Sequence, residues 1–580
     1  MQSFLRWILK LVKKPSFLAF TYFTILTCVM TYPVIFRMNE LIGGGGGDGT
    51  YYVWLIRWYQ KALFELHISP FYTPYLNYPQ GWYLVTIDTT PAMVALGLPV
   101  NLLFGPVVGY NFAMLFSFLL AGWGMYLWVR HLTENNLAGL VAGTIFAFIP
   151  YHMAHYIVGH LNVAGIQWFP FYFWGLYDLL KQDKFFWKPV LMASISAVLI
   201  SLTSPYYLYM TVLMSGVFIL GFIVFKGYRQ LKKWIFWKSL LAFGLLTSLL
   251  VGLSLLPYFD PNARNGLTSF SVDMASRYSA SPTDFVLPSV WHFLWGTWID
   301  NTFQPGFSNE ATLYIGVLSF ILMVLSWVKW RKLQRPQIIG ISLTVALAGF
   351  ILALGIDLHW LGHKVVVLPP FLQLVFHRTD LPQINLPAYY LFRYLPFFSK
   401  MRVMMRFGVF TLIFASLMAG LGTHLFLGSF STKSRKWVAL ILLVLVFIDF
   451  YPGPFNDMAP IGGSPTYTWL ATQPDTGAVA IFPFSEESGQ RAVYNTLLYN
   501  KPFLGGHFNA SHPEQYVRIT PVMEGFPSAD SVNLLRQLGV AYVIVDSTQY
   551  AGFVEVDQTI QSLGLNLLHV SSTDFIYGWP

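Results

Sequence analysis

The chain has little charge and almost no cysteine. Charged residues make up 11% of its 580 positions, whereas about a quarter of a soluble globular protein is charged. This scarcity excludes an ordinary soluble protein for most of the length. The single cysteine, Cys28, excludes a disulfide within the chain and lies inside the first apolar segment, which argues against thiol chemistry. Hydrophobic residues instead occupy 55% of the positions, so most of the chain is expected to be solvated by lipid.

Long apolar runs follow one another as far as residue 452. A transmembrane helix needs about 20 mostly apolar residues, and about eleven segments meet this length test. A further run, 90–104, is too short to span comfortably and is closed by Gly105 and Pro106. We expect this run to be a re-entrant or interfacial helix. The expected spans cover approximately residues 16–36, 107–129, 137–150, 163–180, 189–204, 206–225, 237–257, 311–328, 337–355, 404–427 and 437–452.

Positive charge is concentrated in the short linkers between the apolar runs. The net charge of +9 therefore reflects membrane topology and indicates no nucleic-acid partner. By the positive-inside rule, basic linkers such as 226–236 lie in the cytoplasm. The N-terminus is then cytoplasmic, and the C-terminal region is extracytoplasmic, in a multi-pass protein of the cell membrane. The loops expected outside are 37–88, 151–162, 258–310 and 356–403.

The pattern changes after the last apolar segment. Short apolar runs at Ala478–Phe482 and Ala541–Val545 are typical of strands, and Ser531–Leu538 is typical of a helix. The sequence thus predicts an α-helical polytopic membrane domain over 1–455 and an extracytoplasmic soluble α/β domain over 456–580. The sequence of the α/β domain has no nucleophile elbow, phosphate-binding loop or dinucleotide fingerprint. We therefore expect a binding or capping module.

Several stretches in the expected outside loops are typical of one superfamily. The loops contain GGGGGDGTYY at 43–52, HMAHYIVGHLN at 152–162, SNE at 308–310 and LPFFSKMRVMMRF at 395–407. An acidic residue just after the first transmembrane helix, with interfacial helices behind it, resembles the GT-C superfamily of membrane glycosyltransferases, in an uncharacterised bacterial branch. The resemblance extends over nearly the whole chain. It implies a polyprenyl-phosphate sugar donor, and transfer on the outer face with inversion at the anomeric carbon.

Acidic residues in these loops are the candidates for catalysis. Displacement at an anomeric carbon needs a base for the acceptor proton. Asp48 is the candidate base, although a solvated turn residue in a glycine linker is the alternative. Glu310 can orient the acceptor or, with Asp48, hold a divalent cation such as Mg²⁺ or Mn²⁺; a helix cap is the alternative. Asp88 is a weaker candidate, for binding substrate. Because Gly49 follows Asp48 where the protein mannosyltransferases of the superfamily have a second acidic residue, the metal requirement and the acceptor class stay open.

Arginines provide a candidate phosphate site. Arg402 and Arg406 are four positions apart at the expected outer start of a helix, so they are expected to share one face. A guanidinium pair suits the oxygens of a phosphate, and Arg393 is nearby. The alternative is contact with lipid headgroups, to which we assign Lys400.

Histidines and tyrosines complete the candidate binding residues. His152, His155 and His160 share one short loop, but no fourth ligand of fitting spacing accompanies them, so the sequence does not favour a zinc site. Hydrogen bonds from His155, His160 and Asn162 to sugar hydroxyls or phosphate are the functional interpretation, and structural histidines at the membrane interface are the alternative. Tyr51 and Tyr52 follow Asp48 and are weak candidates for binding the acceptor, because membrane proteins enrich tyrosine at both interfaces in any case.

These observations predict an integral-membrane glycosyltransferase of GT-C type, a hexosyl or pentosyl transferase of the cell envelope. Its expected partners are a polyprenyl-phosphate sugar donor, an extracytoplasmic glycan, lipid or protein acceptor, and the lipid bilayer. A transporter or lipid flippase is the first alternative, although the expected spans contain almost no ionisable residues at mid-membrane and no inverted repeats. A non-catalytic assembly protein of the cell envelope is the second alternative.

Overall fold

Five helices of the computed structural model are long and apolar enough to cross a membrane, within the residues that the structure describes. Those residues are 14–44, 46–86, 89–260, 269–306, 309–366, 373, 384–455, 458–461, 463–474, 477–508 and 512–580. The five candidate spans are α5 (Pro106–Thr133), α6 (Asn136–Phe148) together with α7 (Pro150–Ile157), α11 (Pro205–Lys226), α12 (Trp234–Ser254), and η9 (Met404–Phe407) together with α20 (Gly408–Leu427).

Shorter apolar helices accompany these spans. They are α2 (Pro15–Met30), α4 (Pro91–Phe104), α10 (Trp187–Thr203), α16 (Val317–Val328) and α17 (Gln337–Ala353). Two further helices of the bundle are α9 (Phe169–Lys181) and α21 (Thr432–Phe450). Several of these helices are shorter than the about 20 residues of a straight span, so the count of about eleven crossings stays a prediction.

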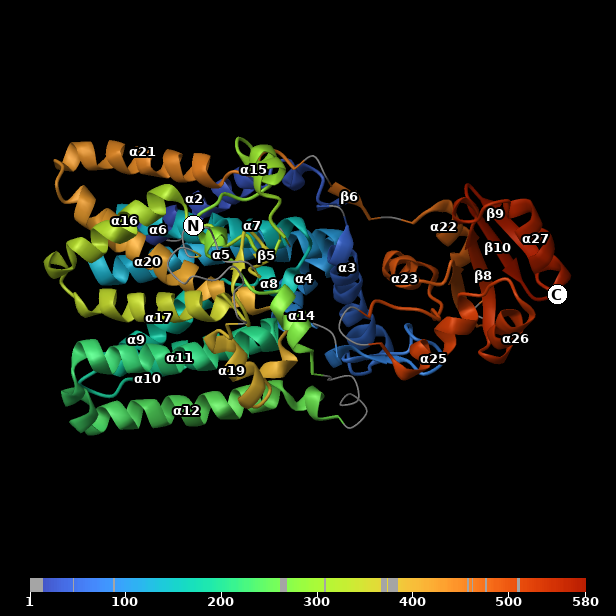
Figure 1. Cartoon of the computed structure of the whole chain (residues 1–580), viewed down its shortest axis with the longest axis horizontal. Helices are drawn as coiled ribbons and strands as arrows, with labels where there is room; N and C mark the ends of the chain where they lie inside the picture. The colour runs from blue at the N-terminus through green and yellow to red at the C-terminus, as the bar shows by residue number, and fades with distance from the viewer. Residues whose placement is uncertain are drawn as a thin grey trace, which may run out of the picture.

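α5 and α20 form the centre of the helical bundle. α5 packs against α2, α4 and α6, and α20 packs against α6, α16 and α17. Small residues permit the closest approaches. A Cβ on Gly97 of α4 would lie 2.6 Å from the carbonyl oxygen of Gly109 on α5, which fits the small-residue packing of membrane helices. Figure 1 shows α11, α12, α17 and α21 running along the long axis of the molecule, with α12 at the edge.

Several segments differ from the sequence prediction, and the span expected over 311–328 is helical only from Val317, where α16 begins. Residues 151–157, expected in a loop, continue the helical path of α6 as α7 after a break at Pro150. Proline fits the first turn of a helix but cannot continue one, and the side chains of 150–156 are buried in the bundle. The expected span 163–180 is likewise divided, into the short helix α8 (Leu161–Ala164) and α9, with Pro170 in the first turn of α9.

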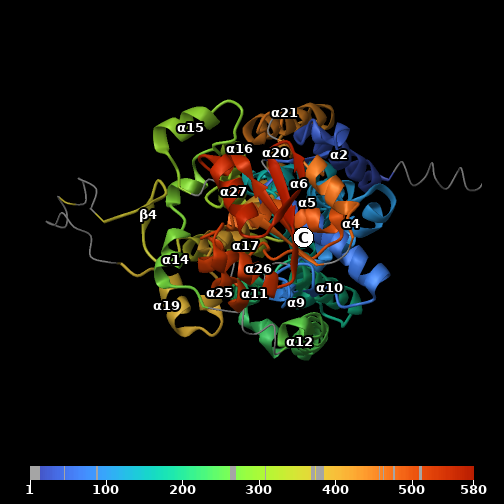
Figure 2. The same cartoon turned by 90° about the vertical axis from the view of Figure 1, so that its right-hand side faces the viewer.

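Short elements gather at the end of the bundle next to the C-terminal part. α3 (Gly47–Gln60) runs across this end, roughly perpendicular to the long helices (Figure 1). Figure 2 looks along the long axis from the C-terminal side and shows α15 and α19 towards the edge of the molecule. The other short elements are η1 (Val34–Phe36), β1 (Leu41–Gly43), η2 (Lys61–Leu66), β2 (Tyr72–Thr73), β3 (Trp82–Tyr83), η3 (Leu84–Thr86), η5 (Leu256–Phe259), α14 (Val272–Arg277), η6 (Pro282–Phe285), α15 (Gly296–Phe303), β4 (His359–Trp360), β5 (His363–Lys364), α19 (Pro387–Tyr394) and η8 (Phe398–Lys400).

The C-terminal part is built on a four-stranded sheet in the order β7-β8-β10-β9. β7 (Ala478–Phe482) is parallel to β8 (Val540–Asp546), while β10 (Asp574–Gly578) is antiparallel to both β8 and β9 (Asn566–Ser571). β7 is buried along its whole length, which explains the uninterrupted apolar run in its sequence. The remaining elements are β6 (Met458–Pro460), α22 (Pro465–Ala471), α23 (Glu486–Ala492), η10 (Val493–Asn495), α24 (Thr496–Tyr499), α25 (Glu514–Met523), α26 (Ala529–Gln537), η11 (Ser547–Gln549) and α27 (Phe553–Ser562).

Candidate active site

Asp48 lies in the first turn of α3, at the end of the glycine-rich loop. This loop is packed against the bundle. Gly44 has a φ of +79°, and a Cβ added there would lie 1.6 Å from the carbonyl oxygen of Ile157, so only glycine fits. A carboxylate in the first turn of a helix is also stabilised by the helix dipole. The structure therefore differs from the alternative of a solvated, flexible linker.

Two imidazole rings approach the carboxylate of Asp48. His160 Nε2 lies 3.3 Å from Oδ2, and His507 Nε2 lies 3.5 Å from Oδ1. Burial raises the pKa of Asp48, but the hydrogen bonds and charges of the two histidines outweigh burial and hold the pKa well below its usual range. Asp48 is therefore ionised at neutral pH.

Glu310 forms the second acidic position of the site. Its side chain is buried and is held by Arg406, whose Nη2 donates to Oε1 at 2.6 Å and whose Nε lies 3.2 Å from each carboxylate oxygen. Burial raises the pKa of Glu310, but the charges of Arg406 and His155 outweigh burial and lower the pKa from 4.5 to about 2. The structure therefore places Arg406 against a carboxylate inside the protein.

His155 and His160 join the two carboxylates. Their Nδ1 atoms are 2.9 Å apart, so one ring donates a hydrogen bond to the other. His155 Nε2 then lies 3.7 Å from Glu310 Oε2. The result is a continuous series of ionisable groups that begins at Asp48 and ends at Arg406. We call this series the acid-histidine chain: Asp48, His160, His155, Glu310 and Arg406.

The acid-histidine chain has too few protons for all its hydrogen bonds when both imidazoles are neutral. Two neutral imidazoles have one N–H each, and the hydrogen bond between the rings uses one of the two. Only one ring can then donate to its carboxylate, and the other presents a lone pair to a negative charge. His155 Nε2 is buried and has no hydrogen-bond partner among the described residues. The arrangement is therefore satisfied by one additional proton or by a cation.

The donor set fits a divalent cation. One ligand atom from each of His155, His160 and Glu310 lies within 4.8 Å of the other two, and Asp48 is next to His160. Two imidazoles and a carboxylate suit Mn²⁺ or Zn²⁺ better than Mg²⁺, which prefers oxygen ligands. The ligand that the histidine spacing by itself did not supply is Glu310, 150 positions after His160.

His152 is not part of this site. One of its ring nitrogens is 3.0 Å from Ser117 Oγ and the other is 2.8 Å from the carbonyl oxygen of Ala147. Its ring stacks on Phe118 at 3.8 Å. These contacts account for all its polar atoms, so His152 has a structural environment.

Arg402 and Arg406 do not share one helical face, because Arg402 lies before the helical segment begins at Met404. The guanidinium of Arg402 lies 5.5 Å from the ring of Phe270 and 5.6 Å from the ring of Tyr278. Arg393 is exposed near the end of α19. The expected phosphate pair is thus divided between two different environments.

The remaining candidates have mixed placements. Tyr51 and Tyr52 are 2% and 4% exposed, so they belong to the core beneath Asp48 and offer little surface to an acceptor. Asn162 is buried in α8. Asp88 lies outside the described residues.

Three site residues were not predicted from the sequence. His507 comes from the C-terminal part, 459 positions after Asp48. Tyr110 is buried on α5, and its hydroxyl oxygen lies 3.1 Å from the position of a Cβ on Gly49. Tyr156 is buried on α7, and its hydroxyl lies 3.0 Å from the corresponding position on Gly43. Nothing in the local sequence around His507 indicated this contact, because the contact depends on how the C-terminal part docks.

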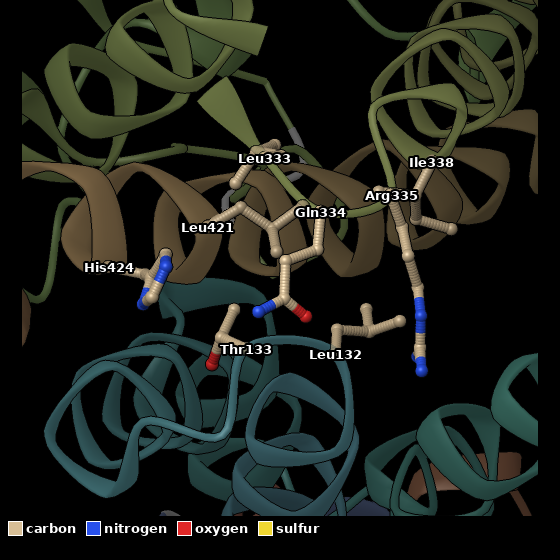
Figure 3. A pocket seen from close by; sticks show the side chains of 8 residues that line it. All are labelled: Leu132, Thr133, Leu333, Gln334, Arg335, Ile338, Leu421 and His424. Atoms are coloured by element: carbon tan, nitrogen blue, oxygen red, sulfur yellow. The ribbon is translucent and has the colours of Figure 1, made fainter. Parts of the chain in front are cut away.

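The pocket shown in Figure 3 belongs to the other end of the bundle. Leu132 and Thr133 line it at the end of α5, together with Arg335 and His424. Tyr110, beside the Asp48 loop, is about 22 residues earlier on the same helix, which corresponds to roughly 33 Å. The pocket is therefore separate from the acid-histidine chain.

Comparisons with known proteins connect this geometry to a fold. The archaeal oligosaccharyltransferase AglB from Archaeoglobus fulgidus, in complex with an inhibitory peptide and a dolichol-phosphate, matches with a TM-score of 0.51 and 13% identity over 97% of this chain and 74% of AglB. The arabinofuranosyltransferase AftD from Mycobacteria matches with a TM-score of 0.52 and 14% identity over 97% of this chain and 41% of AftD. The likeness shows that this chain shares the fold of these two proteins. No curated protein matches the chain.

The sequence also matches a family model over most of its membrane part. The model is described as a domain of unknown function (DUF6311), and it matches residues 19–378. This range includes Asp48, His155, His160 and Glu310, and it ends before Arg406 and His507. The match extends over more than half of the chain, which therefore belongs to the DUF6311 family.

Proposed function

We propose that this protein is an integral-membrane glycosyltransferase. It transfers a sugar from a polyprenyl-phosphate donor to an extracytoplasmic glycan, lipid or protein acceptor, with inversion at the anomeric carbon. The observation that carries this proposal is the acid-histidine chain, at the end of the bundle next to the C-terminal part. Glu310, His155 and Arg406 are buried, and Asp48 and His160 are partly buried. Removing such groups from water is costly unless they are paired, and such clusters are concentrated at functional sites.

Asp48 and His160 act together on the acceptor. The carboxylate of Asp48 accepts the hydrogen bond of the attacking hydroxyl and orients it. A carboxyl group with a strongly lowered pKa is a weak proton acceptor, whereas imidazole suits proton transfer near neutral pH. We therefore assign orientation to Asp48 and proton acceptance to the Asp48–His160 pair, whose contact is 3.3 Å.

The donor phosphate is assigned to arginines near the same end of the bundle. Arg402, beside Phe270 and Tyr278, and the exposed Arg393 supply charge for the phosphate. Arg406 acts indirectly, because its guanidinium holds Glu310. AglB has been seen with a dolichol-phosphate, which supports a lipid-linked phosphate as the leaving group here. His155 and Asn162 are 0% and 3% exposed, so neither is assigned to sugar hydroxyls.

A divalent cation is part of the proposal. His155, His160 and Glu310 would hold it, with Asp48 beside them. The cation would supply electrostatic stabilisation of negative charge in the transition state. The residues themselves bind, orient and exchange the proton.

Topology completes the proposal. Segment length predicts about eleven crossings. Together with the positive-inside rule, this number puts the N-terminus in the cytoplasm and residues 456–580 outside the cell membrane. The acid-histidine chain then lies near the outer surface of the membrane. A lipid-linked donor can enter this position sideways from the bilayer, with its polar head at the level of the arginines.

The test is a transfer assay with a matched pair of variants. In vitro, purified protein is given a polyprenyl-phosphate sugar and an acceptor, and sugar transfer is measured. In cells, a deletion strain that carries each variant is examined for loss of one sugar from a surface glycan or lipid. Asp48→Asn keeps the size of the side chain and removes its charge, so we expect a loss of about 10²–10⁴-fold. Asp300→Asn, at an exposed position on α15, serves as the control and should retain activity.

Two outcomes would overturn the proposal. If Asp48→Asn restores the wild-type product as fully as the unmutated chain, the acid-histidine chain is not the transfer site. If the deletion strain accumulates lipid-linked donor on the inner leaflet while transfer of supplied donor continues, the protein is a flippase.

A further inference from the structure

The start of the C-terminal part, at β6, packs against the loop that carries Asp48. β6, directly after the last helix of the bundle, pairs antiparallel with β1, so that Ile42 faces Ala459 in the register. A Cβ on Gly46, two positions before Asp48, would lie 3.2 Å from the Cβ of Ala459. The linker between the two parts therefore supports the loop that carries Asp48.

A second segment of the C-terminal part docks on residues 75–78, which follow α3 and η2 in the chain. The backbone N–H groups of Asn77 and Tyr78 donate to the carbonyl oxygens of Gly505 and Phe503 at 2.9 and 3.1 Å. The Phe503 N–H donates in return to Tyr75 O at 2.9 Å. Three backbone hydrogen bonds at this spacing resemble a strand pairing and fix the path of the chain just before His507.

His507 is held in a defined orientation by this docking. It is 5% exposed, and its ring lies 5.1 Å from the ring of Tyr51. Its Nε2 lies 3.5 Å from Asp48 Oδ1, and this buried nitrogen has no hydrogen-bond partner among the described residues. The other oxygen of Asp48 faces His160. Each carboxylate oxygen of Asp48 is thus faced by a different imidazole, one from each part of the molecule.

We infer that His507 is a positioning residue for Asp48, contributed by the C-terminal part. This inference rests on the proposed function. The N–H of His507 holds Oδ1, so that the carboxylate keeps one orientation towards His160 and the acceptor. The C-terminal part therefore completes the active site, in addition to any role in binding the acceptor. A misplacement of a reacting group by about 1 Å can cost about 10²-fold in rate, so one orienting hydrogen bond is enough to matter.

Two substitutions separate the hydrogen bond from the packing of the ring. His507→Phe keeps an aromatic ring on Tyr51 and removes the donor, whereas His507→Gln keeps an N–H donor at a similar reach. We expect His507→Phe to lower kcat about 10–100-fold with little change in the KM for the lipid donor, and His507→Gln to recover most of that loss. His569→Phe is the matched control, because His569 stacks on Trp469 in the same part of the chain.

A measurement without activity tests the contact itself. In a double-mutant cycle, the unfolding temperatures of His507→Phe, Asp48→Asn and the double variant are compared with that of the wild type. Coupling predicts that the double variant loses less than the sum of the two single losses. This cycle gives a result even if no acceptor is accepted, so a failure of the proposed function is distinguishable from a failure of this inference.

Three results would overturn the inference. Additive temperature shifts would show that His507 and Asp48 do not interact. Full activity of His507→Phe would show that the ring of His507 contributes only to packing. Equal losses in His507→Phe and His507→Gln, with the His569→Phe control unchanged, would show that the donated hydrogen bond is not what the site uses.

Discussion

The guanidinium of Arg406 is bound to both carboxylate oxygens of Glu310, 96 positions earlier in the chain. The two side chains are 9% and 3% exposed. Buried pairs of this kind are not strong stabilisers compared with apolar residues, but removing one partner leaves an unpaired charge inside the protein. This pair also holds one end of the acid-histidine chain, so it connects stability with the proposed chemistry.

Breaking this pair should destabilise the fold more than removing it. Arg406→Met leaves the charge of Glu310 unpaired, and Glu310→Gln leaves that of Arg406 unpaired. We expect each variant to lower the free energy of unfolding by about 3–5 kcal/mol. The double variant should recover a substantial part of that loss. Thermal unfolding in detergent measures the three variants, and a double variant that loses the sum of the single losses would contradict the pairing.

Acid should weaken the wild type through Glu310. Its pKa is lowered from 4.5 to about 2 by Arg406 and His155, which outweigh the opposing effect of burial. A lowered pKa in the folded state stabilises the protein fully above pH 4.5, and this contribution disappears as the pH falls towards 2. The unfolding temperature of the wild type should therefore fall more steeply from about pH 5 to about pH 2 than that of Glu310→Gln. Parallel curves would show that Glu310 titrates normally.

Metal binding should depend on the histidines of the acid-histidine chain. We expect His155→Ala to weaken the binding of Mn²⁺, measured by electron paramagnetic resonance of the free ion, because the site loses one of its nitrogen ligands. His67→Ala changes an exposed histidine that is not part of the acid-histidine chain, and this variant should bind Mn²⁺ as the wild type does. Equal binding by all three proteins would leave an additional proton, in place of a cation, as the group that satisfies the site.

Arg402 should affect the lipid donor specifically. A charge-assisted hydrogen bond to phosphate typically contributes about 1.5–3 kcal/mol, so Arg402→Gln should raise the KM for the polyprenyl-phosphate sugar by about 10-fold or more. kcat should change much less. Lys400→Gln, two positions away, is the control that tests contact with headgroups. An unchanged donor KM in Arg402→Gln would assign this arginine to the headgroups as well.

Topology can be tested with the single native cysteine removed. In a Cys28→Ser background, Arg229→Cys and Glu555→Cys introduce thiols at two exposed positions. The positive-inside rule predicts that an impermeant thiol reagent added outside labels position 555 and does not label position 229. Labelling of both positions from the same side would contradict the expected number of crossings.

Much of the architecture follows from local sequence. α5, α11 and α12 lie where the hydropathy of 107–129, 206–225 and 237–257 predicted helices, and β7 and β8 occupy the apolar runs at 478–482 and 541–545. The break before Pro170 was harder to predict, because the flanking residues are apolar and the average hydropathy hides a change of direction. The expected span 137–150 did end at Pro150. Residues 151–157, however, were expected in a loop and are helical.

Chemistry and resemblance also led from the sequence to Asp48, Glu310, His155, His160 and Arg406 as individual candidates. Their pairing was a matter for the tertiary structure. Arg406 was expected beside Arg402 because helical spacing relates residues four apart, but it is paired with Glu310, and His507 had no local signal at all. Hydropathy and helix periodicity depend on near neighbours in sequence, whereas ion pairs and hydrogen bonds depend on distances in space. Only the packing of α7 against the bundle and the docking of the C-terminal part bring these groups within hydrogen-bonding reach.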